Sequence, residues 1–68
     1  MSELIFLVEE APEGGFTAHS PGTSIFTEGD DLASLRRNVR DSVHVHFEEE
    51  ERPRTVRLHF TRDEVITI

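Results

Sequence analysis

The spacing of apolar positions predicts one long helix in the second half of the chain. Within residues 31–51, apolar side chains recur every three or four positions, at Leu32, Leu35, Val39, Val43 and Phe47. This period is typical of a helix with one buried stripe. Asp31 is the expected N-cap, and Arg52-Pro53 is the expected stop, because proline disfavours helical geometry in the residue before it. We expect a helix of about 20 residues that ends in an acidic run.

The residues before this helix are typical of three short strands. Residues 4–8 (LIFLV) form a continuous apolar run, as in a strand with both faces covered. The turn chemistry of Glu13-Gly14-Gly15 leads to an alternating segment at 16–20, so the first two strands should form an antiparallel hairpin. Pro21-Gly22 turns the chain again, and a third short strand is expected at 25–27.

After the helix, residues 55–60 (TVRLHF) show a clear alternation of apolar and polar side chains, which predicts a fourth strand. We expect residues 61–64 to turn and residues 65–68 to form a fifth strand or a tail. The order β-β-β-α-β predicts one α+β domain over residues 1–68, with one helix packed on a mostly antiparallel sheet.

One helix covers only one face of a sheet, so Ile5 and Leu7 on the opposite face need another cover. Residues 65–68 are apolar and would leave an exposed strand edge if unpaired. Small domains without disulfides often gain stability by self-association, and the chain has no cysteine. We therefore expect a homodimer or a higher homo-oligomer, in which the last segment is a candidate for exchange between subunits.

The balance of acidic and basic residues limits the kinds of molecule that this protein is expected to bind. The formal net charge is −7, from fourteen acidic residues and seven arginines. Nonspecific nucleic-acid binding depends on basic patches, so direct binding to nucleic acid is not expected. The chain has no apolar run long enough to span a membrane and no secretory signal pattern, so we expect a soluble, cytoplasmic protein.

The spacing of histidines and carboxylates, the candidate metal-binding and catalytic residues, does not predict that they meet at one site. His44 and His46 are two positions apart, which points them to different faces of a helix, and His19 and His59 occupy outward positions of separate strands. The carboxylates do not share a spacing that would bring them to one point, and Asp31 already has a capping role. We expect no catalytic residues, no metal site and no cofactor. The alternative is a small metal-dependent nuclease, which would need convergent carboxylates on neighbouring strands.

A run of four acids is unusual at the expected end of a helix: Glu48, Glu49, Glu50 and Glu51. Negative charge there opposes the helix dipole, and adjacent carboxylates repel one another. One interpretation is a frayed, solvated helix end. The functional interpretation is a binding surface for arginines or lysines of a partner. Arg36, Arg37 and Arg40 form a small basic band on the same helix, for which surface ion pairs with residues such as Asp41 are the preferred explanation.

Several short elements together resemble the HicB-like antitoxin family, in order and spacing across residues 4–47. The first is Glu13-Gly14-Gly15-Phe16-Thr17-Ala18, followed by Ser20-Pro21-Gly22. The second runs from Phe26 through Thr27-Glu28-Gly29-Asp30-Asp31 to Leu32, and Asn38-Val39-Arg40-Asp41-Ser42-Val43 follows it. Each element alone is weak, and the ordered set is moderately specific.

The resemblance implies a degenerate ribonuclease-H-like β-β-β-α-β unit without catalytic ability. Members of the family that have a toxin partner bind a small, basic, mRNA-cleaving protein and cover its catalytic histidine, whereas others are solitary small proteins. Many full antitoxins also carry a C-terminal DNA-binding module, but only eight residues follow Phe60 here. The resemblance therefore implies an antitoxin-type interaction protein, or a solitary protein-binding module, that does not itself bind DNA.

Overall fold

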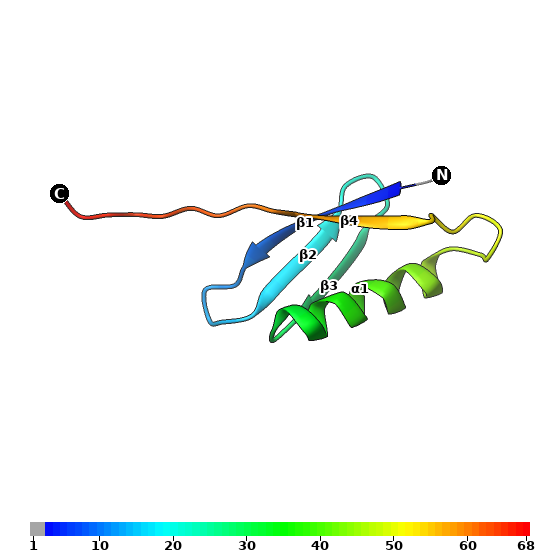
Figure 1. The fold of residues 1–68 in the computed structure, drawn as a ribbon, viewed down its shortest axis with the longest axis horizontal. Helices are drawn as coiled ribbons and strands as arrows, with labels where there is room; N and C mark the ends of the chain where they lie inside the picture. Colours follow the sequence, from blue (N-terminus) through cyan, green and yellow to red (C-terminus); the bar gives the residue numbers. More distant parts are fainter. Residues whose placement is uncertain (1–2) are drawn as a thin grey trace.

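The computed structural model of the chain describes residues 3–68 as one four-stranded sheet with a single helix on one face (Figure 1). The elements follow in the order β1 (Glu3–Glu10), β2 (Phe16–Ser20), β3 (Ile25–Gly29), α1 (Leu32–His46) and β4 (Thr55–Phe60). The predicted α+β class, the β-β-β-α-β order and the antiparallel hairpin of the first two strands are confirmed.

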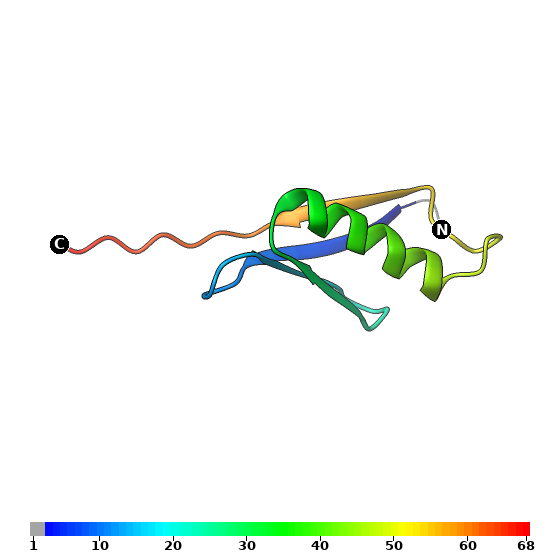
Figure 2. The same ribbon diagram turned by 90° about the horizontal axis from the view of Figure 1, so that it is seen from below.

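The strands lie in the order β3-β2-β1-β4, so β1 is an inner strand and β4 is an edge strand. β1 pairs antiparallel with β2, and β2 pairs antiparallel with β3. β4 pairs with β1 in parallel, with Leu4 opposite Val56 and Val8 opposite Phe60. The connection from β3 to β4 runs through α1, which lies on one face of the sheet and closest to β3 and β2 (Figure 2).

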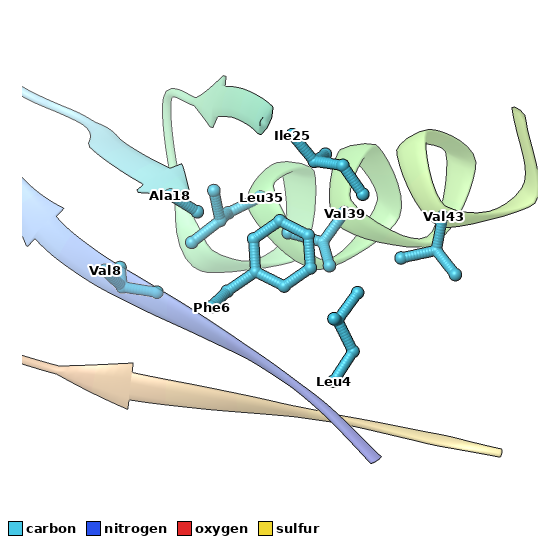
Figure 3. Packing of buried hydrophobic residues seen from close by; sticks show 8 residues of the cluster. All are labelled: Leu4, Phe6, Val8, Ala18, Ile25, Leu35, Val39 and Val43. Atoms are coloured by element: carbon cyan, nitrogen blue, oxygen red, sulfur yellow. The ribbon is translucent and has the colours of Figure 1, made fainter. Parts of the chain in front are cut away.

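The core lies between α1 and alternate residues of the three N-terminal strands. Figure 3 shows side chains of β1 pointing toward side chains of α1, with β2 and β3 closing the cluster. Its buried members are Leu4, Phe6, Val8, Ala18, Ile25, Leu35, Val39 and Val43. The predicted helical stripe is therefore confirmed at its centre, whereas Leu32, at the first turn, is 36% exposed and lies outside the buried cluster.

The N-terminus of α1 is capped as expected. Asp31 has extended backbone geometry, and its carboxylate Oδ1 accepts a hydrogen bond of 2.7 Å from the backbone N–H of Ser34. This bond satisfies one of the helix N–H groups that have no partner within the helix. The bond to the Ser34 N–H, followed by the Ser34 side chain, lowers the pKa of Asp31 below its ordinary value.

The helix is shorter than predicted at its C-terminus. It ends at His46, and Phe47 takes an extended conformation while its N–H still bonds to the Val43 carbonyl at 3.0 Å. The acidic run therefore lies in the turn after the helix and not on its last turn. The physical reason is the one that made the run unusual: consecutive carboxylates oppose the negative end of the helix dipole. The Arg52 guanidinium instead donates to the carbonyls of His44 and Phe47 at 3.4 Å.

The segment after β4 differs from the prediction at the expected turn, whereas of the two alternatives for residues 65–68 the tail is the one observed. Residues 61–64 do not turn, and residues 65–68 form no strand. The backbone N–H of Thr61 donates to the Val8 carbonyl at 2.9 Å, which continues the direction of β4. From there residues 61–68 extend away from the domain, as Figures 1 and 2 show from two sides. This tail extends along the 53 Å long axis of the molecule and exposes Val65, Ile66 and Ile68.

Candidate interaction surfaces

Two of the sequence elements that carry the family resemblance meet in space at the start of α1. Gly15 lies in the loop between β1 and β2, and Phe16 is paired with Gly29 across the β2–β3 ladder. A Cβ atom on Gly15 would lie 2.8 Å from the Gly29 carbonyl oxygen. A Cβ on Gly29 would lie 2.5 Å from the backbone nitrogen of Leu35. Both glycines are therefore required by close backbone contact, which fixes the hairpin loop against the helix N-terminus.

The other motif positions have local structural roles. Gly14 adopts a positive φ in the first hairpin loop, and Pro21-Gly22 lies in the second turn, where Thr23 bonds back to the Ser20 carbonyl. Phe16 packs against the core and makes an edge-to-face contact with Phe60, with the ring centres 6.5 Å apart. Asp30 is exposed in the bend before the helix. Gly14, Phe16 and Asp30 therefore lie at the end of the sheet where the helix begins, whereas Pro21-Gly22 turns the chain at the opposite end.

The acidic turn, defined as Glu48, Glu49, Glu50 and Glu51, projects from the domain between α1 and β4. All four residues are exposed, and the N–H of Glu51 bonds to the Glu48 carbonyl at 3.0 Å, which makes a tight turn. Within residues 3–68 none of the four carboxylates forms an ion pair within 4 Å. The turn therefore presents four adjacent negative charges to solvent, on a backbone that is held at both ends by the helix and by Arg52.

The face of the sheet opposite α1 is open. Across this face the strand register places four residues in one row, in the order Phe26, His19, Leu7 and His59. Phe26 is 62% exposed and the neighbouring Ile5 is 46% exposed. The expectation that both faces of β1 are covered is met on the helix side only: Leu4, Phe6 and Val8 are buried, whereas within residues 3–68 no second layer covers Ile5 on the open face.

A groove runs between α1 and β4 on the helix side of the sheet. The side chains of Val56 and Leu58 on the inner face of β4 pack against the core but are only partly buried, so the helix does not fully cover the edge strand. The groove has a volume of about 440 Å³. Its apolar lining comes from Val39, Val43, Pro53, Val56 and Leu58, and its basic lining comes from Arg36, Arg40, His44, Arg52 and Arg54. We call this feature the arginine groove.

The arginine groove is locally positive, although the molecule as a whole is negatively charged. Four of the seven arginines line it, and no carboxylate is among its lining residues. The Nδ1–H of His44 donates to the Arg40 carbonyl at 2.8 Å, so that ring is tied to the helix backbone. The Nε of Arg52 is buried and has no hydrogen-bond partner among the described residues. The groove thus combines an apolar floor with positive charge that nothing in residues 3–68 neutralises.

The basic band of the helix was interpreted from sequence as part of a network of surface ion pairs, and this interpretation is wrong. Over residues 3–68 the ion pair within 4 Å joins Arg57 to Glu3, at 2.6 Å on the open face of the sheet. Arg36 and Arg40 instead point into the groove with arginines from the loop after the helix. The sequence signal that was missed is the spacing of Arg36 and Arg40 beside the buried Val39 and Val43, which places charge at the margin of the apolar stripe.

Apart from the acidic turn, the carboxylates and histidines of residues 3–68 do not form a cluster. Glu9 and Glu28 share the open face but are separated by Thr17 on the strand between them. No group of three His, Asp or Glu side chains in residues 3–68 could hold a metal ion. None of the helices in the described part has the length and apolar content needed to cross a membrane.

The chain is similar to small proteins of one group. A UPF0150 protein of Archaeoglobus fulgidus is 51% identical over 51 residues, which span 75% of this chain and 76% of that protein. A UPF0150 protein of Thermotoga maritima is 33% identical over 66 residues, which span 97% of this chain and 93% of that protein. No family model matches the chain, and no solved structure matches it.

Proposed function

The chain belongs to the UPF0150 family, and we propose that it is a HicB-like, antitoxin-type interaction protein that neutralises a small, basic, mRNA-cleaving protein. The single observation that carries this proposal is the acidic turn, whose four exposed carboxylates have no ion-pair partner within residues 3–68. A cluster of like charges that stabilises nothing in its own domain is suited to a basic partner.

The resemblance to the HicB-like family supports the same proposal. Its glycine elements, Glu13-Gly14-Gly15 and Thr27-Glu28-Gly29, come from separate parts of the sequence and are in contact at the helix N-terminus. Elements that form one structural unit are stronger support for a family likeness than the same elements taken one by one. The proposed role is binding, because four adjacent exposed carboxylates on one turn suit recognition of a basic surface.

The test uses association kinetics between this chain and the purified product of the neighbouring reading frame, which we expect to be a basic protein of roughly 60–80 residues. Reversal of Glu49 and Glu50 to lysine should slow association on the order of tenfold at low salt, since opposite charges steer the encounter of the two proteins. Salt should reduce the wild-type rate, because the Debye length is about 8 Å at physiological ionic strength.

A matched control variant distinguishes the effect of the acidic turn on the association rate from the effect of net charge. Glu10→Lys with Glu13→Lys makes the same change in charge at two exposed residues at the far end of the sheet. We expect this control to associate at close to the wild-type rate. If the control and the Glu49/Glu50 variant slow association equally, the acidic turn is not the binding surface. A wild-type rate for the Glu49/Glu50 variant, together with insensitivity to salt, would contradict the proposal directly.

A further inference from the structure

The arginine groove and the tail, defined as residues 61–68, have complementary chemistry. The groove offers an apolar floor and four arginines without carboxylates. The tail carries Asp63 and Glu64, followed by apolar side chains that are almost fully exposed: Val65 at 92%, Ile66 at 70% and Ile68 at 110%. Within one chain these two features are separated, because the tail leaves the domain from the end of β4 that lies away from the acidic turn (Figure 1).

We propose that the arginine groove binds the tail of a second copy of this chain, so that two chains exchange their tails across a two-fold axis. β4 is an edge strand and the tail continues it in the same direction. If two such edges pair antiparallel, each tail runs along the other chain's β4. The tail is long enough for this arrangement, since its eight residues span about 26 Å and the six residues of β4 span about 20 Å.

The alternation of apolar and polar side chains along β4 favours one register between β4 and the tail of the other chain. Val56, Leu58 and Phe60 lie on the helix side of the sheet, as shown by their pairing with Leu4, Phe6 and Val8. If the extended tail keeps this alternation, its even-numbered residues face the same side. Pairing Leu58 of one chain with Ile66 of the other also brings Val56 opposite Ile68, so both isoleucines cover the open floor of the groove.

The same register accounts for the charges. It places Glu64 opposite Phe60 of the other chain, at the end of β4 beside the first turns of α1, because the helix and β4 run in opposite directions (Figure 2). Arg36, in the second turn of α1, is one of the residues that line the groove. Glu64 of one chain therefore lies near Arg36 of the other. The two-fold axis passes at Arg62, where each arginine has Glu64 two positions further along its own strand to offset the like charge.

Return of the tail into the groove of its own chain is disfavoured by the same geometry. It would need a tight reversal directly after Phe60, and the hydrogen bond from the Thr61 N–H to the Val8 carbonyl instead keeps the chain extended at that point. Exchange between two copies needs no turn. This inference is independent of the proposed toxin partner, since the acidic turn and the groove are separate surfaces.

Disulfide trapping tests the register, and the chain has no cysteine of its own to interfere. Leu58→Cys and Ile66→Cys variants are purified separately, mixed and oxidised mildly. We expect a covalent dimer that contains one chain of each kind, and the pair Val56→Cys with Ile68→Cys should give the same result if Leu58→Cys is poorly folded. Mixing Ile5→Cys with Ile66→Cys is the control, because Ile5 lies on the open face, and it should give no mixed dimer.

Sedimentation equilibrium tests the energetics with a matched pair of variants. Ile66→Glu should raise the dimer dissociation constant on the order of a hundredfold, since it places a charge on an apolar floor. Val45→Glu makes the same kind of change at an 88% exposed helix residue outside the groove and should leave the constant unchanged. Arg36→Glu and Glu64→Arg should each weaken the dimer, and the two changes combined should restore it.

Three results would overturn the inference. The first is a wild-type mass of 7.8 kDa, that of one chain, at every concentration up to the millimolar range. The second is a disulfide that forms within single chains of a Leu58→Cys, Ile66→Cys double variant and never between the mixed single variants, which would show that each tail occupies its own groove. The third is a dimer of unchanged affinity in Ile66→Glu, which would place the interface on another surface such as the open face of the sheet.

Discussion

At the scale of single residues, the glycines of this chain illustrate what a sequence can predict. A paired glycine between two strand patterns predicts a hairpin turn, and Gly14 and Gly15 form one with positive φ angles. The contact between Gly15 and the Gly29 carbonyl could not be predicted, because it depends on how the loop and the helix N-terminus are placed in three dimensions. The same holds for Gly29, whose φ is ordinary and whose missing Cβ is required by the neighbouring Leu35 backbone.

Asp31 was predicted as the N-cap and is confirmed as such. Because its pKa is lowered in the folded state, its ionised form stabilises the fold at pH values above the ordinary value of 3.8, and this contribution is lost as the pH falls through the lower folded value. Asp31→Asn keeps an oxygen acceptor for the Ser34 N–H but cannot titrate.

We therefore expect the wild type to be more stable than Asp31→Asn above about pH 5, with the difference shrinking as the pH falls below about 4. Urea unfolding of both proteins across this range measures the difference, and other carboxylates cancel because both proteins contain them. A difference that stays constant with pH would mean that the capping carboxylate is not charged in the folded state.

At the scale of elements, periodicity predicted the stripe of α1 well and its ends less well. Leu35, Val39 and Val43 are buried as the spacing required, because a 3.6-residue period can be read directly from sequence. Packing of Phe47 on the core favours a longer helix, whereas the carboxylates after it disfavour one, and the helix ends at His46. The apolar period of the sequence does not tell which of these two effects is stronger. The tail was expected to turn at 61–64 on composition alone, whereas the hydrogen bond from Thr61 to β1 keeps it extended.

The two leucines of the first helical turns provide a direct test of this account of α1. Leu35 is fully buried and Leu32 is 36% exposed, although both belong to the same apolar stripe. Leu35→Ala should lower the free energy of unfolding by about 2–5 kcal/mol, whereas Leu32→Ala should cost less than about 1 kcal/mol. Chemical denaturation at one fixed protein concentration measures both, since self-association makes stability depend on concentration. Equal losses for the two variants would contradict the described packing.

At the scale of the whole molecule, the net charge predicts only part of the distribution of charge over the surface. The overall value of −7 correctly anticipates an acidic surface, but it conceals a groove in which four arginines converge. Arg36 and Arg40 come from the helix and Arg52 and Arg54 from the loop after it, so only the packing of α1 relative to β4 brings them together. The surface thus carries both signs of charge in separate clusters, four carboxylates on the acidic turn and four arginines in the arginine groove.

The most direct test of the proposed function is an RNA-cleavage titration with the basic product of the neighbouring reading frame. Cleavage by that protein should fall steadily as this chain is added and cease near an equimolar ratio, while this chain alone leaves RNA intact with or without magnesium or manganese. The Glu49→Lys, Glu50→Lys variant should need a clear excess. Unchanged cleavage at a large excess of wild-type chain would contradict the account, as would metal-dependent cleavage by this chain alone that is lost when Glu9 or Glu28 is replaced by glutamine.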